Sequence, residues 1–248
     1  MAEPVSAAAL NCQLIEIWKQ QSHTALVPML YPDPRPGSLL FIGINPSLGE
    51  HDVVRVLKGT EFEASVPSRA AVRPYFTFRP ETIEEELPDW QQIQLYHRQR
   101  LRYFKRHREL AQLAGLGDHW EQLDLFQVRE SSQLNLVELV RNNAHDPFFD
   151  EQLRIFFDLL ELMAPRIMVI VNRTTGDLLK ERWLKKRLDE TVLTPTAEPD
   201  VFTLSFRGQQ IPVVFSVHLQ YKPAAEREQI NSRLTQIVRS AMDFSFNL

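Results

Sequence analysis

The sequence predicts an α/β fold with a mostly parallel sheet, and two observations lead to this prediction. Residues 39–42 and 166–171 form apolar runs, which are typical of strands buried on both faces of a parallel sheet. The segments around these runs carry apolar residues at helical spacing. Strands that alternate with helices in this way form an α/β sandwich.

The predicted helices begin near the N-terminus. Residues 6–21 are expected to form an amphipathic helix, because Leu10, Leu14 and Trp18 recur at helical spacing. A longer helix is predicted over residues 89–114, where glycines follow as stop signals. Further helices are predicted over residues 134–141, 147–163, 174–188 and 224–241.

The predicted strands cover residues 39–44, 123–129, 166–172, 201–206 and 211–217. The last two flank the polar stretch Arg207-Gly208-Gln209-Gln210, which predicts a hairpin. Residues 48–90 are expected to be an irregular loop insertion, with a short helix soon after Ser47. The whole chain, residues 1–248, is expected to be one domain.

The composition is that of a globular protein. The chain is 44% apolar and 24% charged, and no run approaches the roughly 18 apolar residues of a transmembrane helix. The N-terminus lacks the basic and apolar segments of a signal peptide. The single cysteine, Cys12, excludes an intramolecular disulfide and is predicted to be a small buried residue of the first helix. These features predict a cytoplasmic protein without membrane contact.

The net charge of −4 argues against a protein that coats nucleic acid through bulk electrostatics. Basic residues nevertheless gather over residues 98–108 and 180–187. In the first stretch they interleave with Leu101 and Phe104, which predicts a helix with an apolar contact and a basic outer face. The alternative is a solvated helix face balanced by the acidic residues 84–86.

The first buried strand ends in a polar group. Gly43 allows close backbone approach, Asn45 carries an amide, and Pro46 ends the ladder because it has no N–H. Ligands of open α/β sheets bind at the carboxyl ends of the strands, so Asn45 is a candidate site residue. The alternative is a tight strand exit with Asn45 as a turn residue. Asn172 similarly follows the third strand, and the sequence assigns it no role.

Gly43-Ile44-Asn45-Pro46-Ser47 resembles the first active-site motif of the uracil-DNA glycosylase superfamily. The form is closest to the Gly-x-Asn-Pro-Gly/Ser motif of its mismatch-specific and single-strand-selective branches. The resemblance implies a three-layer sandwich around a four-stranded, mostly parallel sheet. It also implies a monomeric DNA base glycosylase that acts on single- or double-stranded DNA.

Two further segments carry the resemblance. The last predicted strand delivers His218, as the second motif of the family does, although Leu219-Gln220-Tyr221 replaces the family's proline and small residue. Asp124 stands five residues before Arg129, where some branches carry a base-reading asparagine. An aspartate accepts from a base but cannot donate, which puts uracil in doubt as the substrate. Asn45 and His218 are expected at the carboxyl ends of adjacent strands.

The residue types suggest how such a site would work. An amide at Asn45 would hold the attacking water, and His218 or backbone N–H groups near Ser47 would donate to the developing negative charge on the base. The aromatic candidates for stacking on a flipped base are Phe62, Tyr75 and Phe76. With one cysteine and no clustered histidines, the chemistry is expected to need no metal and no cofactor.

The same residues also allow purely structural interpretations. Aromatic residues in loops commonly fill hydrophobic contacts, and a histidine after a strand commonly makes structural hydrogen bonds. Three functions therefore stay open: a base glycosylase, a protein of the same fold that only binds nucleic acid or a nucleotide, and an interaction protein with a vestigial pocket. The acidic net charge, Asp124 and the altered His218 motif favour the second of these.

Overall fold

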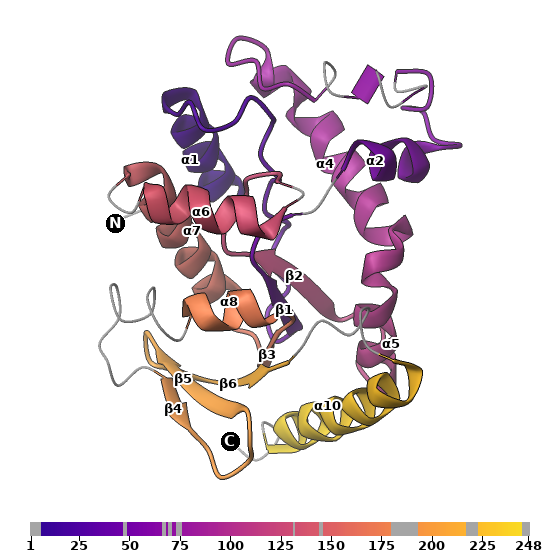
Figure 1. Cartoon of the computed structure of the whole chain (residues 1–248), viewed down its shortest axis with the longest axis vertical. Coiled ribbons are helices and arrows are strands. Elements are labelled where there is room, and N and C mark those ends of the chain that lie inside the picture. The colour runs from indigo at the N-terminus through magenta and orange to yellow at the C-terminus, as the bar shows by residue number, and fades with distance from the viewer. Residues whose placement is uncertain are drawn as a thin grey trace. The chain divides into compact units, whose positions relative to one another are not determined.

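The computed structural model of the chain (Figure 1) describes residues 6–46, 49–65, 68, 71–72, 76–130, 132–143, 146–179, 193–216 and 223–244. The chain divides into two compact units, and each unit is assembled from segments far apart in the sequence. The first comprises Met1–Asp33, Asn45–Phe104 and Asp124–Asp158. The second comprises Pro34–Ile44, Lys105–Leu123 and Leu159–Leu248.

A six-stranded mixed sheet makes the fold α/β (Figure 1). In spatial order the strands are β2 (Trp120–Asp124), β1 (Leu39–Gly43), β3 (Ile167–Ile170), β6 (Gln209–Phe215), β5 (Val201–Phe206) and β4 (Leu193–Pro195). Strand β3 pairs in parallel with β1 and with β6, whereas β5 pairs antiparallel with β6 and with β4. The expectation of four strands is therefore wrong, because the hairpin and the short strand β4 extend the sheet at one edge.

The apolar runs form the centre of the sheet, as predicted. Leu39 is aligned with Ile167 and Ile42 with Ile170, and every residue of β1 and β3 is buried. The predicted hairpin is also present. Its two-residue turn consists of Arg207 and Gly208, with φ values of 44° and 82°. Positive φ at both positions is typical of the type I′ turn, whose twist matches that of the paired strands.

Among the described residues of the second unit, helices pack on the sheet and on one another. Helices α8 (Arg173–Leu178) and α10 (Ala224–Phe244) both pack on β3, and Figure 1 shows them on either side of the sheet. Gly176 of α8 lies so close to Phe215 that a Cβ atom there would be 3.0 Å from the ring. Helix α5 (Lys105–Leu113) packs against α10.

The first unit is mainly helical. It contains α1 (Ala7–Gln20), α2 (Glu50–Leu57), α4 (Ile83–Arg100), the 3₁₀ turn η1 (Arg102–Phe104) and α6 (Gln133–Asn142). Helix α7 (Pro147–Met163) contributes residues 147–158 to this unit and its last five residues to the other. Trp18 of α1 packs against Phe148 of α7, with ring centroids 4.9 Å apart. None of the helices in the described ranges is long and apolar enough to span a membrane.

Helix α1 confirms the first predicted helix but corrects the burial of Cys12. Ser6 caps the helix by accepting from the N–H of Ala9. The buried face carries Leu10, Leu14 and Trp18, and Cys12 is exposed. At 100° per residue, position 12 lies outside the apolar stripe, so the spacing of the stripe decides its burial rather than the residue type.

Two other boundaries differ from the sequence prediction. The helix predicted over residues 89–114 begins earlier, at Ile83, and breaks after Arg100. Leu101 and Phe104 turn inward at the break and are buried. The strand predicted over residues 123–129 is β2, which ends at Asp124, and the following residues leave the sheet. The prediction was too long because several residues after Asp124 are apolar and buried, although they do not belong to a strand.

Asn172, which has no role by sequence reasoning, caps α8. Its Oδ1 accepts hydrogen bonds from the N–H of Thr175 at 2.7 Å and from the Oγ1 of Thr175 at 2.8 Å. The side chain is buried, so its removal would leave buried donors without an acceptor. The structure therefore assigns Asn172 to the stability of the helix that follows β3.

We expect Asn172→Ala to lower the free energy of unfolding by about 1–2 kcal/mol, because an N-cap is lost. Asn172→Asp keeps an acceptor at the same place and should retain most of that stability. Urea denaturation of the three proteins measures the effect. Equal stability of Asn172→Ala and the wild type would contradict the capping role.

Candidate functional site

Asn45 lies two residues after β1, and its side chain hydrogen-bonds to a distant part of the sequence within the first unit. It is 8% exposed. Its Nδ2 donates one hydrogen bond to the carbonyl of Val128 at 3.1 Å and another to the carbonyl of Glu130 at 2.6 Å. Both partners are more than 80 residues away in the sequence, so Asn45 is a long-range anchor and not a local turn residue.

This pairing fixes the orientation of the Asn45 amide. A carboxamide nitrogen has two hydrogens, and both are directed at carbonyl oxygens. The amide oxygen, Oδ1, must then point away from residues 128–130, and within the described ranges it accepts no hydrogen bond. Such an oxygen is suited to accept a hydrogen bond from a water molecule or a ligand.

The segment that Asn45 holds is a tight turn centred on Arg129. The N–H of Glu130 donates to the carbonyl of Val128 at 3.1 Å, which closes the turn around Arg129. Asn45 therefore donates hydrogen bonds to the carbonyls of the two residues that flank Arg129. Two residues before Arg129, the N–H of Gln127 donates to the Oε1 of Gln152 at 2.7 Å. The side chains of Asn45 and Gln152 thus both hydrogen-bond to the backbone of this segment.

Arg129 extends from the turn over two aromatic rings. The guanidinium carbon lies 5.2 Å from the centroid of the Phe76 ring and 5.6 Å from that of Trp90. The two rings contact each other at 4.5 Å between centroids, and both side chains are almost fully buried. Cation–π contacts of a desolvated guanidinium contribute about 2 kcal/mol. We call Arg129, Phe76 and Trp90 the arginine–aromatic cluster.

The charge of Arg129 persists in this environment. Its Nε and Nη1 atoms are buried, and burial lowers the pKa of Arg129 to about 10. The guanidinium consequently remains protonated at neutral pH. The segment that Asn45 contacts thus carries a buried cation, and a positive charge attracts electron-rich groups.

His97 lies near this charge on the same buried face of α4 as Trp90. Its ring packs edge-on against Phe104, with 5.3 Å between centroids. Burial, and to a smaller extent the charge of Arg129, lower the pKa of His97 to about 3. His97 is therefore a neutral imidazole throughout the physiological range.

The other predicted site residues are placed as follows. Gly43 is the last residue of β1, Ile44 is buried directly after it, and Pro46 follows Asn45. Phe62 is 8% exposed and packs edge-on against Tyr96 of α4, with 6.5 Å between centroids. Asp124 ends β2, and its charge acts with burial in raising the pKa of Tyr31.

The structure does not bring all of the predicted residues together. Ser47, Tyr75 and His218 lie outside the described residues. The expectation that Asn45 and His218 follow adjacent strands is wrong, because β3 lies between β1 and β6. Phe76 is fully buried beneath Arg129, so a base could stack on its ring only if that contact opened.

Sequence reasoning did not find the roles of Arg129, Trp90 and His97. Arg129 could be noticed as a basic residue after a buried apolar stretch, but its aromatic partners come from a different part of the chain. Trp90 and His97 resemble ordinary core positions of a helix. Within the described ranges, no three His, Cys, Asp or Glu side chains are grouped so that they could hold a metal ion.

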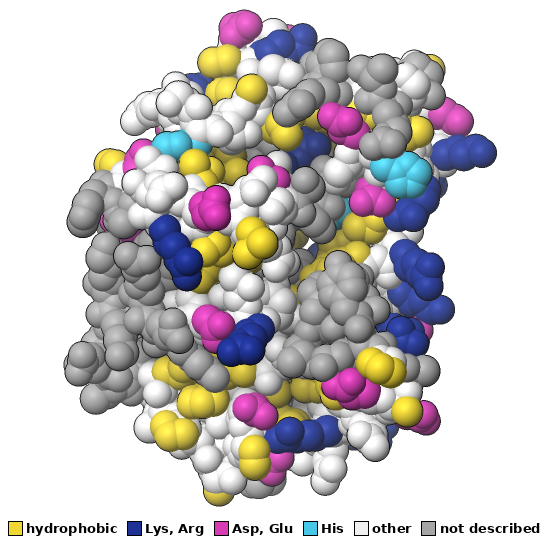
Figure 2. All heavy atoms as spheres, in the orientation of Figure 1, with side chains coloured by type: hydrophobic (Ala, Val, Ile, Leu, Met, Phe, Trp, Pro, Cys, Tyr) yellow, Lys and Arg dark blue, Asp and Glu magenta, His cyan; other side chains and the backbone are white. Residues whose placement is uncertain are grey.

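A group of basic side chains, which we call the basic edge, belongs to the same unit and comprises Arg55 of α2, Lys58 directly after it, and Arg98 and Arg100 of α4. Figure 2 shows Lys and Arg side chains along the edge where α2 and α4 lie in Figure 1. Arg100, at the end of α4, donates to the carbonyls of Val56 and Lys58 at the end of α2 and lies over the ring of Tyr96 at 4.7 Å. Exposed cations of this kind bind phosphate groups without reading a sequence.

The lowered pKa of His97 has a consequence for stability. In the unfolded chain a histidine binds a proton below about pH 6.5, whereas folded His97 stays neutral down to about pH 3. Since the unfolded state then binds more protons, the stability contributed by neutral His97 is complete above pH 6.5 and falls as the pH is lowered.

We expect the free energy of unfolding to fall by about 1.4 kcal/mol for each pH unit below 6.5 because of His97 alone. His97→Gln removes this titration. The free energy of unfolding of the variant should therefore depend less on pH between 6.5 and 5, which is above the range in which most carboxylates titrate. Urea denaturation at several pH values gives both slopes. Parallel curves for the wild type and His97→Gln would show that His97 is not held neutral.

Comparisons with known proteins assign no family to this arrangement. No protein-family model matches the chain, and no curated protein matches it. The function of the site is therefore argued from its own residues: an anchored amide at Asn45, a buried cation at Arg129 and a basic edge along α2 and α4.

Proposed function

We propose that the protein is a DNA base glycosylase that hydrolyses the N-glycosidic bond to a damaged or deaminated base. The observation that carries the proposal is the anchored amide of Asn45. Both of its hydrogens are bound to main-chain carbonyls, so its oxygen is held in one direction. A water molecule bound to that oxygen would be held in a fixed position for attack on the sugar.

The reaction needs little more from Asn45 than this. The water oxygen bonds to the anomeric carbon while the bond from that carbon to the base nitrogen breaks, and the electron pair leaves with the base. The sugar gains the hydroxyl group, and the remaining proton of the water ends on the released base. An amide cannot take that proton, so Asn45 contributes position rather than general-base catalysis.

Electrostatics support the same chemistry. The departing base carries negative charge in the transition state, and fixed positive groups in a desolvated site stabilise such charge. Arg129 provides a buried positive charge in the segment that Asn45 holds. His218 stays a predicted donor to the base, and the basic edge along α2 and α4 suits the phosphates of a DNA strand.

Two observations favour a second function. Phe76, a predicted stacking residue, is fully buried and its ring is occupied by Trp90 and Arg129. Asp124 also differs from the asparagine that the resemblance leads one to expect. A protein that binds nucleic acid or a nucleotide without cleaving it would satisfy both observations.

We expect Asn45→Ala to lower the single-turnover rate of base excision by about 10²–10³-fold, as the loss of one positioned polar group does. Binding of the oligonucleotide should change little, because the phosphates are held elsewhere. The substrates are oligonucleotides with uracil, hypoxanthine, xanthine or a mismatched thymine, and alkali then cleaves the abasic sites. Asn172→Ala is the matched control, since it removes a buried asparagine that caps a helix.

The outcomes separate the two functions. Cleavage at equal rates by Asn45→Ala and the wild type would contradict the role of Asn45. A wild-type protein that binds these oligonucleotides and excises no base from any of them would support the binding function instead.

A further inference from the structure

We propose that Arg129 is a positioning residue for Asn45. Its flat guanidinium, laid on Phe76 and Trp90, fixes the turn whose carbonyls hold the Asn45 amide. The effect on catalysis rests on the proposed function, whereas the effect on the amide itself does not.

The first link joins Asn45 to the turn. The Nδ2 atom contacts the carbonyls of Val128 and Glu130, and the hydrogen bond between Glu130 N–H and Val128 O closes the turn that carries both of them. If the turn opened, a single nitrogen could not reach both acceptors. The direction of the Asn45 amide therefore depends on the shape of a turn that has Arg129 at its centre.

The second link joins the turn to the aromatic rings. Arg129 lies over both rings of the cluster, at 5.2 and 5.6 Å from the guanidinium carbon to the centroids. Its side chain thereby attaches the centre of the turn to residues that lie about 40 and 50 positions earlier in the chain. A turn attached at its carbonyls by Asn45 and at its side chain by the rings has little freedom to change shape.

The rings themselves are fixed by the backbone. The N–H of Phe76 donates to Val72 O at 3.0 Å, and the carbonyl of Phe76 accepts from Val27 N–H at 3.1 Å. Trp90 is one of the buried residues of α4. Two aromatic rings that are held rigidly can impose a preferred geometry on the Arg129 side chain stacked on them.

The planarity of arginine is the feature that matters here. A guanidinium lies flat on an aromatic face, whereas the ammonium of lysine is a compact charge on a flexible stem. Arg129→Lys therefore keeps a long basic side chain and removes the flat contact. If charge alone mattered, lysine would substitute for arginine at this position.

The direct test is hydrogen exchange of the Asn45 side-chain amide, measured by NMR on ¹⁵N-labelled full-length protein. The signal is assigned by its disappearance in Asn45→Ala. We expect slow exchange in the wild type and exchange at least about tenfold faster in Arg129→Lys, because the turn loosens and the two hydrogen bonds open more often. Unchanged exchange in folded Arg129→Lys would overturn the proposal.

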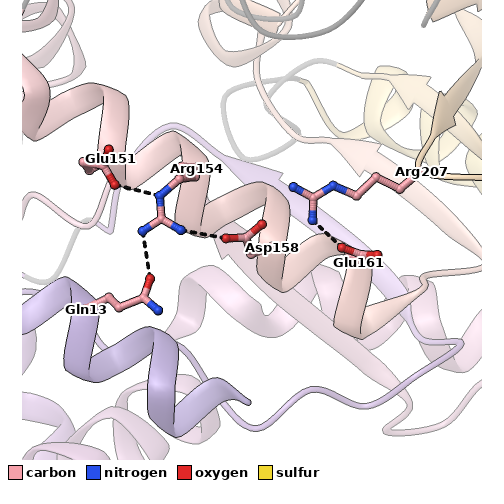
Figure 3. A network of polar contacts seen from close by, with 6 residues as sticks. All are labelled: Gln13, Glu151, Arg154, Asp158, Glu161 and Arg207. Carbon is pink, nitrogen blue, oxygen red and sulfur yellow. Dashed lines mark hydrogen bonds and ion pairs between the residues drawn. The ribbon is translucent and has the colours of Figure 1, made fainter. Parts of the chain in front are cut away.

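The matched control is Arg154→Lys in the same unit. Arg154 donates to Gln13 of α1 at 2.8 Å, to Glu151 at 2.7 Å and to Asp158 at 2.9 Å, both on α7 (Figure 3). Its replacement removes several side-chain hydrogen bonds without touching the turn at residues 128–130. Exchange of the Asn45 amide should stay at the wild-type rate in Arg154→Lys, and acceleration as large as in Arg129→Lys would show only general loosening and overturn the proposal.

A second variant covers the case in which Arg129→Lys does not fold. Trp90→Leu keeps an apolar side chain at the position and removes one of the two ring contacts of Arg129. It is expected to speed exchange of the Asn45 amide as well. A folded Trp90→Leu protein with the wild-type exchange rate would contradict the proposed link through the rings.

Single-turnover cleavage supplies the catalytic readout. Arg129→Lys should lower the rate constant by about 10²-fold with little change in oligonucleotide affinity, because a displaced water attacks poorly. When Arg129→Lys is added to Asn45→Ala, the rate constant should fall almost no further, since both substitutions act through the Asn45 amide. Full additivity would overturn the positioning role. A wild type that excises no base removes the proposed function, and the exchange comparison still decides the link from Arg129 to Asn45.

Discussion

The first unit depends on one bridging interaction, in which the amide nitrogen of Asn45 satisfies two main-chain carbonyls at once. An amide nitrogen has two hydrogens, and a buried donor without a partner costs about 1–3 kcal/mol. The chain gains most when both hydrogens of Asn45 are used in the turn at residues 128–130. This requirement leaves the amide oxygen directed away from the turn, and the proposed chemistry follows from that direction.

The turn that Asn45 contacts also carries a buried charged residue, Arg129. A turn that exposes Arg129 to water would leave its guanidinium free, whereas in this structure it lies against Phe76 and Trp90. Burial of the charge costs free energy, which the ring contacts offset in part. The neighbouring His97 stays neutral because burial, and to a smaller extent the charge of Arg129, lowers its pKa. The site thus combines one fixed dipole, one fixed charge and one uncharged imidazole in a largely apolar surrounding.

Local patterns allowed the centre of the fold to be predicted, and long-range pairings limited the rest. The strands β1 and β3 and the hairpin were predictable because burial on both faces and a two-residue turn leave clear signals. Strand β4, with three residues, leaves none and is the described strand that the sequence patterns missed, whereas the expected number of four came from the resemblance. Asn45 was found from its place after a buried strand, but its partners near residue 129 could not be, because a pairing across more than 80 residues has no local pattern.

The most direct test of this account is the orientation and solvation of the Asn45 amide in a crystal structure. At a resolution better than about 1.2 Å the nitrogen and oxygen of the amide can be distinguished by their hydrogens. We predict that the nitrogen faces the carbonyls of Val128 and Glu130 and that an ordered water lies within hydrogen-bond distance of the oxygen. An amide turned so that its oxygen faces residues 128–130, or an oxygen that contacts protein atoms alone, would contradict it.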